Sequence, residues 1–484
     1  MKKRFLILSL LLISVLAFSQ NKKNAPTKKP NTQKNKVVPA TNVVNYTDYN
    51  PPTTTNLLTF ERVLPPKVYD YTTSDLGVKW HQLIFDLIEQ TNGYTPNVAA
   101  RSMAYINLAF YETIVPSYKN YQSLSGQLQG FSRPDSLMPD SASIYAPAAA
   151  NEAIFLMVDK LFAPAPYVWM ERVYATKDSI DMIFAQNTSA EIMNDSQEYG
   201  RKIAAWIYEY AKTDGGDMAF LRSYDMNYKV PVCESCFEIN RVADLENTGP
   251  LHPNWGKNRT FLADNTQDFG IKPLKEFSKY QGSPFHQQAM EVYRTAMEVK
   301  PGSEKLLIAN FWDDAATFTY TATGHSLSIL SQHLRANTTD LAKSASLFCQ
   351  LSLGVSDAMI VCWGLKYKYN TIRPIAYIKR YIDSQFEPAL LTPPFPEFPS
   401  GHSVQSATMA TVLTSKIGDN VAVTDYSKFF VGPPRKFNSF WESANETSIS
   451  RLYGGIHFKD ALDQGQVLGK KIGENVLKLK FLKD

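Results

Sequence analysis

Apolar residues recur at intervals of three and four along most of the chain, the period of a helix with one buried face. Leu76, Trp80 and Leu83 follow this spacing near the start of the folded region. Similar patterns predict helices at 75–90, 98–113, 147–162, 190–212, 284–299, 304–317, 339–367, 400–417 and 459–479. The segments 213–280 and 374–399, rich in proline and aromatic residues, are predicted to be long ordered loops. Since no set of alternating strands accompanies these helices, we expect an all-α fold, a large helical bundle with long ordered loops.

The first residues follow a different pattern. Lys2, Lys3 and Arg4 precede an apolar run over 5–18, and small residues follow at the positions that a signal peptidase reads. A membrane-spanning helix needs about 20 apolar residues, more than this run has. The pattern therefore predicts a signal peptide at 1–19, cleaved before Gln20.

Residues 20–45 are rich in Lys, Asn, Thr and Pro, and are predicted to form a disordered linker. We expect an exported protein, periplasmic or secreted, without stable membrane insertion.

Composition and charge constrain the remaining body. A chain of 484 residues with 44% hydrophobic residues can bury a large core. We divide this body into an N-terminal helical part, 46–280, and a C-terminal helical part, 281–484. Nine of the Lys and Arg residues and no acids lie in 1–45, so the formal charge of +4 for the whole chain becomes −5 for the rest. A slightly acidic body argues against nucleic acid as a partner.

The four cysteines favour a disulfide over a metal site. Cys233 and Cys236 form a single CxxC motif, with no second CxxC or nearby histidine to complete a zinc site. In an exported protein, a disulfide that closes this short loop is the better interpretation. Cys349 and Cys362 lie in an apolar helical stretch and are predicted to be buried hydrophobic residues.

Three short segments in the last quarter of the chain carry the candidate chemistry. They are Lys366-Tyr-Lys-Tyr-Asn-Thr-Ile-Arg373-Pro374, Pro399-Ser400-Gly401-His402 and Ser450-Arg451-Leu-Tyr-Gly-Gly-Ile-His457. Lys366, Arg373 and Arg451 would be costly to bury together unless an anion compensated their charge. At a helix start, backbone N–H groups and the helix dipole also favour an anion.

Small and titratable residues complete this pattern. Gly401 permits close approach of a ligand, and Ser400 adds a hydroxyl donor. Of the two histidines, His402 and His457, one can bond the central atom of an oxyanion while the other moves a proton. Taken singly, each segment has a simpler interpretation: a solvated helix face, a capped helix start or a structural histidine. Only the three together predict a pocket for a phosphate-like oxyanion.

In this order and spacing, the three segments resemble the signature of the superfamily that unites type-2 phosphatidic acid phosphatases, bacterial acid phosphatases and vanadium-dependent haloperoxidases. A looser likeness to bacterial haloperoxidase-like proteins extends to 96–101, Trp255-Gly256 and 311–314. One departure concerns an aspartate that the family often has four residues after the last histidine. Ala461 occupies that position, with Asp460 and Asp463 beside it. An orienting role for that aspartate is therefore not carried over.

The resemblance implies one of two activities. In a haloperoxidase, vanadate would be the cofactor, bonded to His457, and hydrogen peroxide and a halide would be the substrates. The vanadate oxygens would contact Lys366, Arg373, Ser400, Gly401 and Arg451. His402 would lie at the apical oxygen and assist proton transfer. In a phosphatase, His457 would carry a phosphoryl group and His402 would protonate the leaving oxygen.

Several features favour the haloperoxidase. The chain is longer than typical soluble acid phosphatases of the superfamily and lacks the membrane helices of the lipid phosphatases. Trp363 and Phe395 match aromatic positions on the halide side of fungal chloroperoxidases, and an apolar wall suits a polarisable halide. Core packing is the simpler interpretation of both rings. A phosphatase and a catalytically silent anion-binding protein stay open as alternatives. Asp314, with Asp313 nearly as good, is a candidate carboxylate to steady Arg373 or Arg451, and a surface acid is the simpler interpretation.

Overall fold

The structure is a computed structural model that describes residues 64–137, 144–239, 249–266, 268–427, 430 and 432–483. The predicted signal peptide, 1–19, and linker, 20–45, lie outside the described residues. Residues 58–484 form one compact unit. Helices from both predicted parts, 46–280 and 281–484, therefore belong to the same unit.

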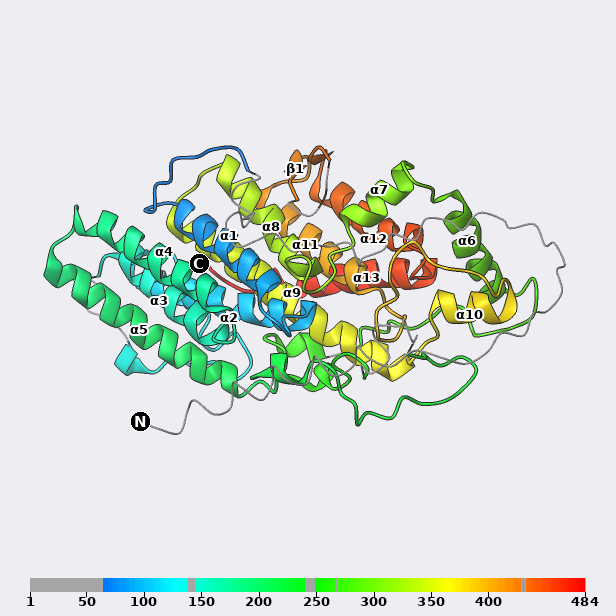
Figure 1. The fold of residues 1–484 in the computed structure, drawn as a ribbon. Helices are drawn as coiled ribbons and strands as arrows, with labels where there is room; N and C mark the ends of the chain where they lie inside the picture. The colour runs from blue at the N-terminus through cyan, green and yellow to red at the C-terminus, as the bar shows by residue number, and fades with distance from the viewer. Residues whose placement is uncertain are drawn as a thin grey trace, which may run out of the picture. The chain divides into compact units, whose positions relative to one another are not determined.

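The described residues contain thirteen α-helices and one two-stranded sheet, joined by 3₁₀ helices and loops (Figure 1). The helices are α1 (Asp75–Gln90), α2 (Pro96–Ile114), α3 (Ala146–Leu161), α4 (Tyr167–Ala185), α5 (Ala190–Lys212), α6 (Pro284–Glu298), α7 (Glu304–Phe311), α8 (Thr321–Ala336), α9 (Leu341–Tyr369), α10 (Pro374–Tyr381), α11 (Gly401–Ile417), α12 (Phe440–Tyr453) and α13 (Lys459–Val476). Short 3₁₀ helices are η3 (Val115–Ser117), η4 (Asp135–Leu137), η6 (Ala219–Arg222), η7 (Trp255–Lys257) and η8 (Ala263–Thr266). Strands β1 (Val423–Asp425) and β2 (Arg435–Phe437) pair antiparallel, with Thr424 opposite Lys436.

The all-α prediction is confirmed, and each predicted helix overlaps an observed one. Four observed helices, α4, α8, α10 and α12, were not predicted from the pattern. In α12, five of the 14 residues are Ser, Thr or Asn, which have low helix propensity. Its start is instead defined by Ser439, whose side chain accepts a hydrogen bond from the N–H of Glu442.

Two predicted boundaries were wrong. The segment 374–399 was expected to be a loop throughout, but it begins with α10, whose first residue is Pro374. Proline at the first helical position is favourable because its fixed φ suits a helix start. The helix predicted over 304–317 ends at Phe311. Beyond it, Asp314 and Thr317 have φ angles of +49° and +69°, which no right-handed helix allows.

Helix α9 forms the centre of the unit. It contacts α1, α2, α8, α11 and α13, and in Figure 1 it passes between the N-terminal and C-terminal helices. Among the described residues it is the single helix long and apolar enough to cross a membrane, but 94% of that stretch is buried inside the protein. Cys349 and Cys362 are buried in it, as predicted. Trp363 and Lys366 follow near its C-terminal end.

The connection from α9 to α10 is held by the CxxC loop. Asn370, with a left-handed φ of +47°, ends α9 and turns the chain toward Arg373. Cys233 and Cys236 form a disulfide, as predicted, and the adjoining Phe237 N–H donates to the Asn370 carbonyl at 2.8 Å. The disulfide loop therefore braces the segment that carries Arg373.

A second packing feature aligns α11 with α13. Gly465, Gly469 and Gly473 recur every four residues on α13 and face α11. A Cβ atom at Gly469 would lie 2.1 Å from the carbonyl oxygen of Val404, closer than any real contact. This glycine stripe lets the two helix backbones approach closely, which fixes the start of α11 beside the start of α13.

Substitution of Gly469 by Ala should therefore destabilise the protein by about 1–3 kcal/mol, the usual cost of overpacking a core. The thermal unfolding midpoint of Gly469→Ala, compared with that of the wild type, measures this effect. Val467→Ala, on the half-exposed side of the same helix, is the control. An unchanged midpoint in Gly469→Ala would contradict close packing of α11 on α13.

Candidate oxyanion site

The three motif segments converge from five helix ends. Lys366 lies in the last turn of α9, Arg373 caps α10, Ser400 caps α11 ahead of Gly401 and His402, Arg451 lies in the last turn of α12, and His457 precedes α13. Among these residues, His457 lies next to Arg373, with its Nε2 3.1 Å from Nη1. Burial first, and then the charges of Arg373, Lys366, Arg451 and His402, hold the pKa of His457 well below 6.5. The structure thus brings together all seven residues predicted from the motifs.

His457 has a defined tautomer. Its Nδ1 lies 2.9 Å from a carboxylate oxygen of Glu397, and its Nε2 lies 3.1 Å from Nη1 of Arg373. A carboxylate only accepts hydrogen bonds when ionised, and a guanidinium only donates them. Nδ1 therefore carries the proton, and Nε2 presents a lone pair on the side of Arg373.

Glu397 is the functional residue that the sequence interpretation missed. The carboxylate is 3% exposed and also accepts the N–H of Phe458 at 2.9 Å. Burial raises the pKa of Glu397 to about 7, although Arg373, the Phe458 N–H and Lys366 favour its charged form. Its position three residues before Ser400, within a segment predicted to be a loop, gave no periodic signal. Asp460 and Asp463 do not substitute for it, since they bond Leu274 and Lys459.

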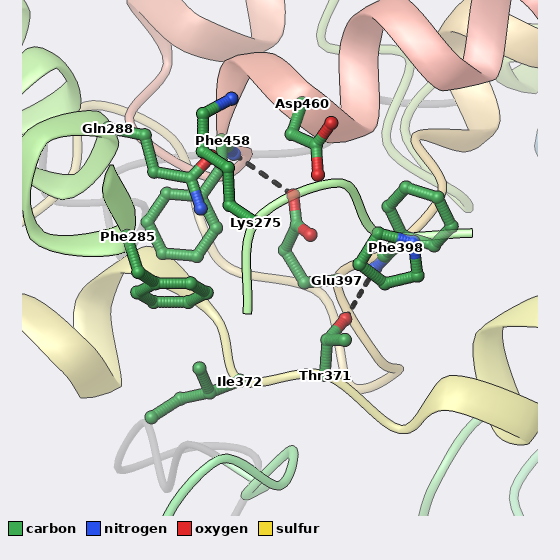
Figure 2. A pocket seen from close by; sticks show the side chains of 10 residues that line it. Lys275, Phe285, Gln288, Thr371, Ile372, Glu397, Phe398, Phe458 and Asp460 are labelled. Carbon is green, nitrogen blue, oxygen red and sulfur yellow. Dashed lines mark hydrogen bonds between the residues drawn. The ribbon is translucent and has the colours of Figure 1, made fainter. Parts of the chain in front are cut away.

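Figure 2 shows the other side of this carboxylate. Glu397 borders a cavity of about 20 Å³ together with Gln288, Phe285 and Asp460. A space of this size holds about one water molecule. The carboxylate therefore borders a small cavity on this side and is held toward His457 and Phe458 by hydrogen bonds on the other.

The two cations on the α9–α10 side are held mainly by backbone carbonyls. Lys366 is fully buried, and its Nζ donates to the carbonyls of Pro396 and Glu397, each at 3.0 Å. Arg373 is equally buried and donates to the carbonyls of Phe395, at 2.9 Å, and Ile456, at 2.8 Å. Burial lowers the pKa of Lys366 to about 7 and that of Arg373 to about 10, so an anion beside them would be stabilising.

Arg451 completes the set of cations from the opposite side. It is 1% exposed, and its guanidinium donates to the Ser450 hydroxyl at 3.0 Å and the Ala309 carbonyl at 3.1 Å. Asp313 lies 3.8 Å from its Nη1.

Asp313, the alternative candidate, is therefore the carboxylate that contacts Arg451, whereas Asp314, the preferred candidate, does not contact this guanidinium directly. Asp314 bonds His325 at 3.0 Å and reaches Arg451 only through the field of its charge. The left-handed backbone at Asp314 turns its side chain away, and sequence spacing does not reveal such a turn.

The start of α11 offers neutral donors. Ser400 accepts the Ser403 N–H as a helix cap, which leaves its hydroxyl proton free to donate elsewhere. The N–H of Gly401 is one of the first helical N–H groups, which have no partner within the helix. A Cβ atom at Gly401 would meet only the Trp363 ring, at an ordinary 3.6 Å. Packing within the protein therefore does not require glycine here, whereas close approach of a ligand would.

His402 and the aromatic pair face this region. Burial followed by the charge of Arg451 holds the pKa of His402 well below 6.5, although the backbone of Trp312 favours its charged form. Trp363 and Phe395 have ring centroids 4.9 Å apart, and Lys366 lies 5.0 Å from the Phe395 centroid. The two predicted pocket aromatics therefore form one apolar wall against the cations.

The residues present fit an oxyanion such as vanadate or phosphate. Within the described part of the chain, two buried nitrogens of the site, Nη2 of Arg373 and Nε2 of His402, have no hydrogen-bonding partner. Buried polar groups without partners are costly, and an oxyanion would accept from the arginine. The central lone pair of His457, the three cations and the open position at Gly401 match the same ligand.

Comparisons with known proteins agree with this chemistry. A family model described as the VCPO second helical-bundle domain matches residues 346–481, which include all three motif segments. No curated protein sequence matched the chain. Two solved structures, a holo-type and an apo-type bacterial vanadium-dependent chloroperoxidase, share the fold at 13% identity. Their TM-scores are 0.60 and 0.58, over 81% of this chain and 93% and 98% of theirs.

A third solved structure is more similar. It is described as the first bacterial vanadium-dependent iodoperoxidase, and it matches with a TM-score of 0.75 and 30% sequence identity. The match covers 87% of this chain and 99% of that one. Together with the fold and the site, this similarity shows that the chain belongs to the vanadium-dependent haloperoxidase superfamily.

Proposed function

We propose that the protein is a vanadium-dependent haloperoxidase, which oxidises a halide with hydrogen peroxide and uses vanadate as its cofactor. The observation that carries this proposal is the tautomer of His457. Glu397 accepts a hydrogen bond from Nδ1–H of His457, and the Nε2 lone pair faces Arg373 among buried cations. A neutral histidine oriented by a carboxylate is the form that binds a metal centre.

The surrounding residues would hold the rest of the oxyanion. Lys366, Arg373 and Arg451 would neutralise its negative charge, while the Ser400 hydroxyl and the Gly401 N–H would donate hydrogen bonds. When bound, vanadate supplies an electrophilic centre at which peroxide is activated toward the halide. The cations increase that electrophilicity because they withdraw electron density from the oxygens they contact.

His402 would handle protons. The overall reaction converts a halide ion, hydrogen peroxide and one proton into a hypohalous acid and water. A group that accepts a proton from peroxide and later returns one must be neutral at rest. Burial and the charge of Arg451 keep His402 neutral, and its Nε2 has no partner in the described residues.

The apolar wall of Trp363 and Phe395 would favour a large, polarisable halide. A wall without hydrogen-bonding groups binds a weakly hydrated anion at less cost than a strongly hydrated one. The 30% identical bacterial protein is described as an iodoperoxidase. Iodide is therefore the first halide to test.

We also propose that the protein is exported after removal of residues 1–19. The N-terminal sequence pattern supports this proposal, and so does a surface disulfide, a bond typical of oxidising compartments. N-terminal sequencing of protein secreted or exported by an expressing cell should find Gln20 first. A mature chain that starts at Met1 and stays in the cytoplasm would contradict the proposal.

Peroxide-dependent oxidation of iodide should require vanadate. Apoprotein stripped of vanadium should have only background activity, and orthovanadate should restore it. Phosphate should inhibit competitively with vanadate, because both tetrahedral anions need the same cations. His457→Ala should abolish turnover even at saturating vanadate.

A generic phosphomonoester assay on the same preparations is the comparison. Efficient phosphatase activity that vanadate inhibits, with no oxidation of iodide or bromide, would make the phosphohistidine phosphatase the correct assignment. Activity that survives vanadium removal would rule out the proposed mechanism.

Glu397→Leu should weaken vanadate binding by about 10–100-fold, the usual effect of losing a carboxylate that orients a metal-bound histidine. Vanadate affinity should fall less in Glu397→Gln, since the amide oxygen can still accept a hydrogen bond from Nδ1–H of His457. Equilibrium dialysis against vanadate measures both affinities. Glu387→Leu, at an exposed glutamate bonded to Lys379, is the matched control. A folded Glu397→Leu variant with wild-type affinity would show that Glu397 does not orient His457.

A further inference from the structure

The loop between α7 and α8 has an unusual backbone. Asp314, Thr317 and Thr321 all have left-handed φ angles, of +49°, +69° and +66°. Non-glycine residues rarely adopt this conformation, and for β-branched threonine it is a marked outlier. Such residues persist only where surrounding contacts enforce them, and they cluster at functional sites.

A buried histidine supplies those contacts. His325 of α8 is 1% exposed, and each ring nitrogen bonds a carboxylate. Nδ1 lies 3.0 Å from Asp314 in the loop, and Nε2 lies 2.9 Å from Asp425 at the end of β1. Burial alone would lower the pKa of His325, but the two carboxylates raise it to about 10. The ring is therefore an imidazolium that donates both N–H groups, and it links three separate elements.

Further contacts fix the same loop. The Trp312 ring stacks on His325 with centroids 4.5 Å apart, and its Nε1 donates to Glu446 of α12 at 2.9 Å. The other oxygen of Asp425 accepts from Gln332 of α8 at 3.2 Å. The loop is thus joined to α8, α12 and the β-hairpin at once, by polar bonds that are mostly buried.

The anchored segment contacts the oxyanion site at three points. The Ala309 carbonyl accepts from Arg451, and the Asp313 carboxylate lies 3.8 Å from the same guanidinium. The backbone of Trp312 lies near enough to the His402 ring to favour its charged form. Among the described residues, the 3.8 Å contact with Asp313 is the one ion pair of Arg451, and His402 has none. The segment 309–314 therefore contributes much of what orients these two side chains.

We propose that Asp314, His325 and Asp425 form a positioning network that holds residues 309–314 in place, so that Arg451 and His402 are oriented before a ligand binds. The network touches neither the oxyanion nor the substrates. Its consequence for catalysis rests on the proposed haloperoxidase function, whereas its effect on the loop does not.

Asp314→Ala tests the central link. This substitution leaves His325 paired with Asp425, a charge-balanced couple, so the core is not left with an unpaired ion. Vanadate affinity and kcat should each fall by about tenfold or more, the scale expected of a lost orienting partner. The KM for iodide should stay within about threefold, because the Trp363 and Phe395 wall is unaffected. Asp314→Asn, which keeps an acceptor for Nδ1, should restore most of both losses.

Asp214→Ala is the matched control. Asp214 is also a buried carboxylate that fixes a loop, through Arg101 and Tyr105, but it has no contact with the site residues. It should lower the thermal midpoint without changing vanadate affinity or kcat. If Asp314→Ala also lost only stability, or if Asp314→Asn were as impaired as Asp314→Ala, the positioning role would be wrong.

Hydrogen exchange on the wild-type apoprotein tests, without any variant, whether residues 309–314 are held in place before a ligand binds. A loop positioned in advance should exchange its amides slowly over 309–320 in the absence of vanadate, and addition of vanadate should change this little. Rapid exchange that slows only with vanadate would overturn the inference, even if Asp314→Ala failed to fold. A wild-type protein that binds no vanadate would instead contradict the proposed function, and the exchange measurement would still judge the network.

Discussion

The burial of three cations in one pocket is the constraint on which the rest of the site depends. Lys366, Arg373 and Arg451 are at most 1% exposed. The carboxylates that act on their charges are Glu397, for Lys366 and Arg373, and Asp313 and Asp314, for Arg451. Desolvation of this kind is costly and must be offset by hydrogen bonds or by a ligand. The fold meets part of the cost with backbone carbonyls from the loops before α11 and α13 and from the end of α7. The part left over is a driving force for binding an anion.

The site combines charged side chains with backbone carbonyls that orient them, and only the side chains could be predicted from the sequence. Cationic side chains and the two histidines carry their chemistry in their residue type, so Lys366, Arg373, Arg451, His402 and His457 could be identified from the motifs alone. The helices that hold them have clear periodicity and were predicted as well, apart from α12 and the short α10. The carbonyls that orient the cations could not be predicted, because every residue has one and only the folded path decides which are aimed at the site. Left-handed turns at residues other than glycine are equally hard to predict, which is why sequence spacing could not decide whether Asp313 or Asp314 contacts Arg451 directly.

Glu397 illustrates how a chemical requirement can be met from a different place in the chain. A histidine that bonds a metal centre needs an acceptor for its other ring proton. A residue four positions after His457, where the family often has aspartate, would lie one turn further along α13. This chain has Ala461 there, and its carbonyl accepts the Ser400 N–H instead. The acceptor comes from the loop before α11, 60 residues earlier. The requirement for a carboxylate is therefore kept, but its position in the sequence is not, and a search restricted to the usual position would judge the site incomplete.

Close helix packing and loop anchoring then act on different halves of the pocket. The glycine stripe on α13 fixes His457 and the start of α11 to each other, because both sit at the ends of the two helices that it joins. Arg451 and His402 also face the loop after α7. Close packing of two helices does not hold this loop, and His325 anchors it instead. A rigid pocket requires both, since an error of about 1 Å in either half would misplace donors around a ligand whose oxygens are only a few ångströms apart. The long connections of this bundle are therefore parts of the site, and their irregular backbone is a condition for the geometry that the regular helices alone would not produce.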